Sequence, residues 1–559
     1  MDILNLIRHN YIRNSIIRYD IIGYILLISI FYSILIPSIL WWFKLSIQPY
    51  IFPLAILLSF LHFCTHSIPI RELILVALLL LLTSILNKIV PDMSWDGQAY
   101  HQPMVYALAH GWNPIYYSHN PIIDPIWNMN IWIDHYPKGM EISAATIAST
   151  TGDLEIGKSV NTLFMLSALT TSLYHLNKCK AFLTNYKIII YSILFACPMV
   201  FINYGFTFYI DVATYYLIFW LMTSIYILEK KYYTKIIWFI LFVIVALSAC
   251  IKWNTFFWVC FFITFYVVYL ILTRNYKRLC SVFFISASSI LFVIITVNYN
   301  PIITNFNDHK NPIYPIGTKE ANAIDINAMP DLLRNKNRIT QVLTSFFSRP
   351  NDNKETPYLS PYHISYRYNI RSLGFGAKLG GGGFFFMEII IISIILLFLS
   401  KENINKRIIV YVSLLFILTP FVLPFGSNYR YIPYISLLPI VILLYTEKTG
   451  FISKSANKAK TVCLILLCIN NLISVPFFLK NTFTSAKSQI NAIHYISKSK
   501  RTDIYRSKNW SFNYKINGNH IINKEIFSDN IENYIAIPNQ FGPPIYMHKV
   551  YFEKETNPE

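Results

Sequence analysis

Long apolar runs alternate with short polar connections along most of the 559-residue chain. Many of these runs approach 20 residues, the length at which an α-helix crosses the hydrocarbon core of a bilayer. Their apolar residues are continuous rather than alternating, so the pattern predicts membrane helices and not the strands of a barrel. About thirteen crossings are expected, over residues 21–42, 51–66, 72–90, 158–176, 187–204, 210–228, 236–251, 254–273, 280–298, 384–400, 408–425, 429–446 and 461–479.

Lysine and arginine recur in every second short connection, starting with the arginines that precede the first run. Cationic loops stay on the cytoplasmic side of a membrane, so this alternation predicts a cytoplasmic N-terminus. Three longer stretches, residues 91–157, 299–383 and 480–559, then fall on the outer side, together with the C-terminus.

The composition narrows the class of protein further. The chain is 55% hydrophobic and 13% charged, and the cationic loops account for much of its formal net charge of +19. No basic-aromatic patch or nucleic-acid motif is present, so a nucleic-acid partner is not expected. None of the eight cysteines falls in an outer stretch, which excludes outer disulfides. The first run lacks a small-residue cleavage site and no organelle signal is visible, so we expect a retained span in a bacterial inner membrane, with a periplasmic outer side.

The first outer stretch opens with the polar run Ser-Trp-Asp-Gly-Gln-Ala-Tyr-His-Gln-Pro. Ser94 or Asp96 can cap a helix over about residues 97–110, which Gly111 would close. Asp96 and His101 place a carboxylate and an imidazole where a span meets water, a pair suited to proton transfer. The plain alternatives are that Asp96 is only a helix cap and that His101 is a hydrogen-bonded surface imidazole.

Other ionisable side chains share a place at the predicted outer ends of spans or in the outer loops: Asp134, His135, Lys138, Asp211, Lys252 and Arg430. Charged groups at membrane depth are costly and usually face a cavity or a partner, so they are functional candidates. The alternatives are span caps, snorkelling lysines and interfacial anchors. Moving a sugar from a lipid phosphate to a hydroxyl requires a base and cations for the departing phosphate, and Asp96 suits the first need. Lys138, Lys252 and Arg430 suit the second.

With these features the chain, over about residues 70–450, resembles the GT-C superfamily of polytopic membrane glycosyltransferases, in particular the protein-mannosyltransferase-like and bacterial dolichyl-phosphate-mannose-type branches. The resemblance rests on short motifs: Trp95–His101 at the place of the catalytic acidic loop, His135-Tyr136-Pro137, Tyr209-Ile210-Asp211, Lys252-Trp253-Asn254, Asn311–Pro315 and Arg430-Tyr431-Ile432-Pro433.

With the apolar pattern, the resemblance implies an all-α, GT-C-like transmembrane domain over residues 1–479. The polar tail over residues 480–559 is expected, from its composition, to be a small periplasmic α+β appendage. The resemblance also implies an inverting transfer of a sugar from a polyprenyl-phosphate donor to an envelope glycan, lipid or protein. The implied catalytic residues are Asp96 and His101, and the implied substrate-binding residues are Tyr100, Asp134, His135, Lys138, Asp211, Lys252 and Arg430.

The motif departs from the family in its acidic pair, because the nearest carboxylate to Asp96 in the sequence is Asp92. A divalent ion prefers several oxygen ligands, so a requirement for Mg²⁺ or Mn²⁺ stays open. Two other functions also stay open. A flippase or transporter of a lipid-linked saccharide is disfavoured by the lack of an internal repeat, and a polysaccharide polymerase by the early position of the polar loop. The motifs do not specify the sugar, the lipid or the acceptor.

Overall fold

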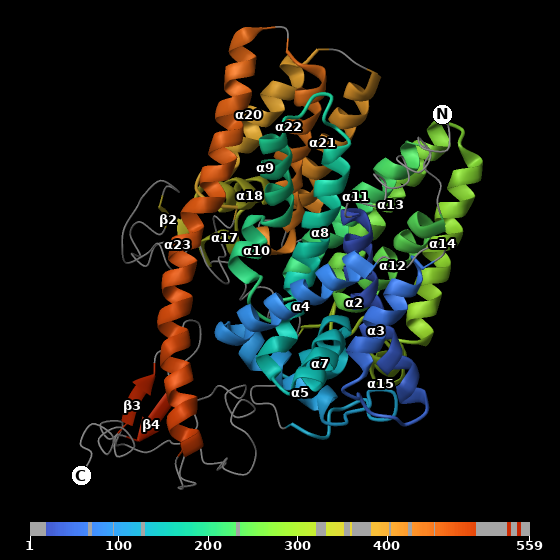
Figure 1. The fold of residues 1–559 in the computed structure, drawn as a ribbon, viewed down its shortest axis with the longest axis vertical. Helices are drawn as coiled ribbons and strands as arrows, with labels where there is room; N and C mark the ends of the chain where they lie inside the picture. The colour runs from blue at the N-terminus through green and yellow to red at the C-terminus, as the bar shows by residue number, and fades with distance from the viewer. Residues whose placement is uncertain are drawn as a thin grey trace, which may run out of the picture.

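The computed structural model describes residues 18–64, 70–92, 94–123, 129–230, 235–319, 331–350, 358–359, 382–401, 404–422, 428–451, 453–498, 534–537 and 545–548. Over these residues the chain is mostly helical (Figure 1). The α-helices are α2 (Tyr19–Trp42), α3 (Ile51–Leu61), α4 (Ile70–Ile89), α5 (Gln102–Ala109), α6 (Asn130–His135), α7 (Gly139–Thr151), α8 (Ser159–Asn177), α9 (Asn185–Ala196), α10 (Met199–Tyr204), α11 (Asp211–Glu229), α12 (Lys235–Ile251), α13 (Trp253–Leu272), α14 (Tyr276–Ile295), α15 (Thr304–His309), α17 (Asp331–Arg334), α18 (Arg338–Phe347), α20 (Phe386–Leu399), α21 (Ile404–Val422), α22 (Leu437–Thr449) and α23 (Lys454–Lys498).

Shorter helical turns and two small hairpins complete the described fold. The turns are the π-helical η1 (Gly97–His101) and η3 (Tyr299–Ile303) and the 3-10 turns η2 (Leu154–Lys158), η4 (Tyr429–Tyr431) and η5 (Pro433–Ser436). Strand β1 (Arg349–Pro350) pairs antiparallel with β2 (Tyr358–Leu359), and β3 (Tyr534–Ile537) pairs antiparallel with β4 (Ile545–His548).

Within the described residues, most of each predicted apolar run lies on one or two helices. Six of the described helical segments are long and apolar enough to cross a membrane, namely α2, α4, α11, α13, α14 and the Lys454–Pro476 part of α23. Four further apolar helices, α3, α9, α12 and α20, are shorter. The helical membrane-protein class is therefore confirmed, whereas the number of thirteen crossings stays a prediction.

The structure departs from two of the predicted spans and from the predicted domain boundary. The run 187–204 is broken into α9 and α10 at Cys197-Pro198, because proline has no backbone N–H to continue a helix. The run 429–446 begins with the turns η4 and η5, and α22 starts only at Leu437. The predicted domain boundary at 479/480 falls inside α23, which continues without interruption to Lys498.

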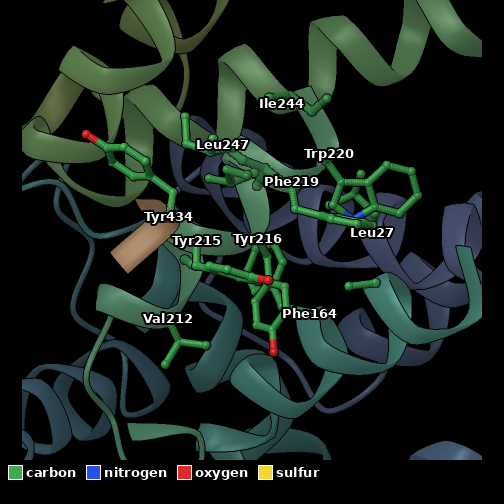
Figure 2. Close-up of a cluster of buried hydrophobic side chains, with 14 of the residues drawn as sticks. Leu27, Phe164, Val212, Tyr215, Tyr216, Phe219, Trp220, Ile244, Leu247 and Tyr434 are labelled. Atoms are coloured by element: carbon green, nitrogen blue, oxygen red, sulfur yellow. The ribbon is translucent and has the colours of Figure 1, made fainter. Parts of the chain in front are cut away.

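Helix α11 lies at the centre of the hydrophobic core. Figure 2 shows its residues Tyr215, Tyr216, Phe219 and Trp220 packed among side chains of α2, α8, α12 and η5. The polar atoms of these large side chains have partners: the Tyr215 hydroxyl donates to the Phe195 carbonyl (3.0 Å), and the Trp220 indole N–H donates to Ser167 Oγ (3.1 Å). The core therefore combines apolar packing with satisfied hydrogen bonds, which fixes α11 against its neighbours.

The two ends of α11 carry different ion pairs. Its first residue, Asp211, binds Lys252 and Arg430, and its last residue, Glu229, binds Arg278. A helix of 19 residues is about 28 Å long, close to the thickness of a hydrocarbon core. Figure 1 shows α5, α7 and α15 gathered at one end of the molecule and α20, α21 and α22 toward the other. The candidate site residues belong to the end that holds α5 and α7.

We predict that Phe164→Ala lowers the free energy of unfolding by about 3–5 kcal/mol, because Phe164 is fully buried beside Tyr216 and its removal leaves a cavity. Phe283→Ala is the matched control, since Phe283 on α14 is 69% exposed within the protein. Unfolding in mixed detergent micelles measures both variants. Equal losses of stability would contradict the assignment of α8 and α11 to the core.

Candidate active site

Four charged side chains from four distant segments form one ion network. The Asp96 carboxylate, just before η1, pairs with the Arg430 guanidinium of η4. Arg430 Nε donates to Asp211 Oδ2 at the start of α11 (2.7 Å), and Lys252 Nζ donates to Asp211 Oδ1 (2.6 Å). Asp96 and Arg430 are 334 residues apart in the chain. The structure thus brings together four of the residues that the sequence singles out.

Neighbouring hydrogen bonds hold Arg430 in place. The side chain of Asn428 accepts from the Arg430 backbone N–H (3.0 Å), which forms the η4 turn. On α13, Asn254 Nδ2 and Trp258 Nε1 both donate to the carbonyl of Tyr431, at 2.8 and 3.1 Å. Two side chains of one helix therefore fix the backbone next to Arg430. This explains the role of the Lys252-Trp253-Asn254 motif, since its first and last residues both act on the network.

The segment before Asp96 is anchored by Asp92 rather than by Asp96 itself. The buried Asp92 carboxylate accepts from the backbone N–H groups of Ser94 (2.7 Å) and Phe208 (2.9 Å). Burial, reinforced by nearby Glu155, raises the pKa of Asp92. Ser94 Oγ accepts from the Gly97 N–H (3.2 Å), so Ser94 caps the helix and Asp96 makes no capping bond. Asp96 is left free to pair with Arg430.

Gly97 is required by this anchor. A Cβ atom at residue 97 would lie 1.9 Å from Asp92 Oδ2, closer than any real contact allows. The helix that follows ends as predicted, with Gly111 at a φ of +104° just after α5. The predicted helix over residues 97–110 is therefore confirmed, with its first turn in the π form.

The network balances its formal charge and opens to solvent on one side. It contains two carboxylates and two cations, and burial disfavours the charged Arg430, but Asp211 and Asp96 outweigh burial and raise its pKa well above the ordinary range. Side-chain exposure is 1% for Asp211 but 14% for Asp96 and 15% for Arg430. A ligand from outside would therefore meet the Asp96–Arg430 pair first.

Two phenol rings line the same site. The Arg430 guanidinium lies over the Tyr209 ring, with its central carbon 4.2 Å from the ring centroid. Burial first, and then the negative charge of Asp96, raise the pKa of Tyr100 and of Tyr209 well above the usual value. Both phenols therefore stay protonated and present neutral hydroxyl groups near Asp96. Tyr209 belongs to a motif quoted above but was not among the predicted site residues.

His101 makes a buried pair with Glu141 of α7. His101 Nδ1 and Glu141 Oε1 are 2.5 Å apart, and the two side chains are only 2% and 3% exposed. The alternative of a surface imidazole is therefore wrong. Sequence reasoning also missed Glu141 as a site residue, although a carboxylate inside an otherwise small-residue, apolar helix is the signal that could have identified it.

Asp134, His135 and Lys138 form a second cluster whose contacts do not include the ion network. Lys138 Nζ donates to the carbonyls of Asp134 (2.8 Å) and Tyr136 (2.9 Å) and to Asn300 Oδ1 (2.7 Å). The carboxylate of Asp134 accepts from the Asn120 N–H (3.0 Å) and lies 3.2 Å from His119 Nδ1. All three contacts of Lys138 Nζ go to neighbouring loop and turn segments, so Lys138 joins these segments rather than facing Arg430.

His135 belongs to the same cluster. Its Nδ1 lies 2.8 Å from Asn305 Oδ1, and its ring packs edge-on against His309 and Tyr314. Burial is the main cause that lowers the pKa of His135. Asn300 and Asn305, which hold this cluster to η3 and α15, are further residues that the sequence analysis did not select.

The carboxylates of the ion network do not suit a divalent metal. Mg²⁺ and Mn²⁺ prefer several carboxylate, carbonyl and water oxygens, whereas Asp96 and Asp211 are both paired with Arg430 and Asp211 also with Lys252. Asp92, the other carboxylate of the motif, is turned toward Phe208. Within the described part of the chain, no group of three or more His, Cys, Asp or Glu side chains is arranged to hold a metal ion.

No protein-family model, curated protein or solved structure shows significant similarity to this chain. The functional argument therefore depends on the geometry of the site and on the short motifs of the sequence.

We predict that Arg430→Gln lowers the free energy of unfolding by about 3–5 kcal/mol, because it leaves two carboxylates short of a cation. Adding Asp96→Asn to this variant should cost less than Asp96→Asn costs the wild type, with a coupling of about 0.5–3 kcal/mol. A double-mutant cycle of unfolding measures the coupling. Asp308→Asn, at an exposed position on α15, is the control and should be additive with Arg430→Gln.

We also predict that stability rises with pH because of Lys138. Burial lowers the pKa of Lys138 from 10.5 to about 7, so between these values the unfolded chain binds one more proton than the folded chain. The free energy of unfolding then rises with pH by about 1 kcal/mol per pH unit within this window. Unfolding of wild type and Lys138→Met at pH 7 to 9.5 tests it: the variant should lose this slope, and Lys277→Met, at an exposed position, should keep it.

Proposed function

We propose that this protein is a membrane glycosyltransferase of the GT-C type, with Asp96 and Arg430 at the centre of its active site. One observation supports this more than any other: the carboxylate of the Trp95–His101 motif is paired with a partly exposed guanidinium that Asp211 orients from the start of a membrane-length helix. A base and an anion-binding group thus lie side by side where an apolar helix begins. Sugar transfer from a lipid phosphate requires this combination.

The reaction that we propose is an inverting displacement. The acceptor oxygen forms a bond to the anomeric carbon of the sugar while the bond from that carbon to the phosphate oxygen breaks. The hydroxyl proton passes to Asp96, and the phosphate leaves with the bonding electron pair. Arg430, with its fork of N–H donors, and Lys252 neutralise the polyprenyl phosphate as it departs. Tyr100 and Tyr209, whose phenols stay protonated, offer hydroxyl groups to the sugar or to the acceptor.

The pairing of Asp96 with Arg430 links donor binding to the release of the proposed base. Arg430 donates to Asp96 Oδ2 and so holds the carboxylate toward itself. A donor phosphate that binds Arg430 competes with Asp96 for the same N–H groups, and so loosens this pair as the donor arrives. The carboxylate is then free to turn toward the acceptor hydroxyl when the leaving group is in place.

The remaining features of the proposal concern location. About thirteen crossings, a GT-C fold and a bacterial inner membrane would put the N-terminus in the cytoplasm and the site in the periplasm. The cationic connections support this orientation. The donor would then be a polyprenyl-phosphate sugar with its head group on the outer side, and the acceptor an envelope glycan, lipid or protein.

We predict that the purified protein in proteoliposomes transfers radiolabelled sugar from a member of a polyprenyl-phosphate-sugar panel to acceptors in envelope extracts. Asp96→Asn should reduce this transfer by about 100-fold or more, because it removes the proton acceptor. Arg430→Gln should raise the donor KM as well, because it removes the phosphate contact. Asp308→Asn is the matched Asp-to-Asn control and should keep the wild-type rate.

The same proteoliposomes separate the competing functions. Movement of intact lipid-linked saccharide across the bilayer, with no new glycosidic bond, would replace the proposal with a flippase. Extension of the saccharide into a ladder of repeats would indicate a polymerase. Wild-type transfer by a correctly folded Asp96→Asn protein would remove Asp96 from the mechanism.

A further inference from the structure

A buried carboxylate oxygen lies beside the active-site helix without a partner. In the His101–Glu141 pair, Glu141 uses its Oε1 atom, and its Oε2 atom has no hydrogen-bond partner among the described residues. Glu141 is 3% exposed, so bulk water does not solvate this oxygen. Leaving a buried acceptor unpaired costs about 1–3 kcal/mol, so Oε2 needs a donor.

A second orphaned acceptor lies on α8. Asn161 Nδ2 donates to the carbonyls of Thr207 and Tyr209, both at 2.9 Å. These carbonyls accept only, so they fix which end of the amide faces them. The other end, Asn161 Oδ1, is buried and has no partner in the described part of the chain.

A small cavity lies between these two side chains. It is lined by Glu141 and Asn161 together with Met140, Lys158, Thr207 and Ile210, among others. The volume within which the centre of a water-sized sphere can move is about 10 Å³. This volume is close to the minimum that holds one water molecule. Of the polar groups on its wall, the Lys158 ammonium already donates to the Asn87 carbonyl (2.8 Å), the Glu155 carbonyl (3.0 Å) and the Glu155 carboxylate. The Thr207 hydroxyl donates to the Tyr204 carbonyl (2.9 Å).

We propose that this cavity is a binding site for one buried water molecule, which donates its two hydrogens to Glu141 Oε2 and Asn161 Oδ1. The stoichiometry fits, because two orphaned acceptors require two donors and the side-chain donors on the cavity wall, Lys158 and Thr207, already donate elsewhere. A continuous hydrogen-bonded line then runs from His101 through Glu141, the water and Asn161 to the carbonyls of Thr207 and Tyr209.

This line makes Glu141 a positioning residue. The hydrogen-bonded line begins at His101, five residues after Asp96, and ends at the Tyr209 carbonyl, two residues before Asp211. Asp96 and Asp211 are the two carboxylates that share Arg430. The direct bond from Asp92 to the Phe208 N–H ties the same two segments together from the other side. The water and Glu141 would therefore set the separation of Asp96 and Asp211. This catalytic consequence rests on the proposed glycosyltransferase function, whereas the water site itself does not.

The first test is a structure of the wild-type protein in nanodiscs at a resolution that orders internal waters. The expected result is one water within hydrogen-bond distance, about 2.7–3.2 Å, of both Glu141 and Asn161. A dry cavity, or a direct contact between the two side chains, would overturn the proposal. Because this measurement needs no substrate, it stands whether or not the protein transfers sugar.

The second test separates positioning from simple stability. Glu141→Gln keeps the shape of the side chain but replaces an acceptor with a donor toward the water. We expect kcat per folded protein to fall about 100-fold and the donor KM to change little. A small misplacement of catalytic groups produces a loss of this size in kcat. A variant that is only less stable would lose folded protein and keep its kcat, and that result would overturn the positioning role.

Ala144→Ser is the second variant, in case Glu141→Gln fails to fold. Ala144 also lines the cavity, so a serine hydroxyl there takes the place of the water while every polar residue of the site is kept. The hydroxyl has one hydrogen and leaves one acceptor unpaired, so kcat should fall less than in Glu141→Gln and the water should be lost. Unchanged kcat after loss of the water would show that the line does not position the site.

Discussion

Two carboxylates, Asp96 and Asp211, meet at one partly buried guanidinium, that of Arg430, and much of the arrangement around the site serves that contact. An uncompensated charge in a low-dielectric interior costs several kcal/mol, so a segment carrying one of these charges is stable in place only when its partners are also in place. Arg430 therefore couples the loop before η1, the start of α11 and the turn η4. Lys252 adds the connection between α12 and α13, because it supplies the second cation that Asp211 requires.

Hydrogen bonds outside the ion network hold the same segments independently of the ion pairs. Asp92 joins the first outer loop to Phe208, Asn161 holds the carbonyls that precede Asp211, and Asn254 with Trp258 holds Tyr431. Because each charged segment has a second anchor, the ion network can exchange a partner without dismantling the end of the helix bundle. The proposed binding and release of an anionic donor depends on this separation between the side chains that bind the anion and those that hold the backbone.

The sequence predicts the helices well because their pattern is local. Continuous apolar runs specify membrane helices wherever they occur, and their ends differ from the structure mainly where proline or a 3-10 turn interrupts the run, as at Cys197-Pro198 and Pro433. The caps of the helix after Ser94 could also be predicted from the sequence, since Ser94 and Gly111 act on their immediate neighbours. The length of α23 could not be predicted, because its polar second half carries no apolar pattern of its own.

The candidate site was predicted in part, and the division has a physical cause. Asp96, Asp211, Lys252 and Arg430 were selected because charge at the end of an apolar run is unusual, and the structure joins all four. Lys138 and His135 were selected because they belong to the polar cluster that closes the first outer loop, but they turn toward loop carbonyls and amides instead. Sequence shows that a charge needs a partner, but only the packing of distant segments decides which partner it finds. Glu141 was missed because its partner, His101, is 40 residues away in another helical segment.

The balance of charge explains why the network is stable without a ligand. Two carboxylates and two cations are in contact, so the network is formally neutral and each of its charges has a partner. Under the proposed function, an entering donor phosphate brings a negative charge that Arg430 and Lys252 are placed to meet. Asp211 is almost fully buried and keeps both cations in place, whereas Asp96 is the more exposed carboxylate and is the one that can move away. The carboxylate that the donor displaces is then the one proposed as the base, so in this proposal donor binding and activation of the acceptor follow from the same exchange of partners on Arg430.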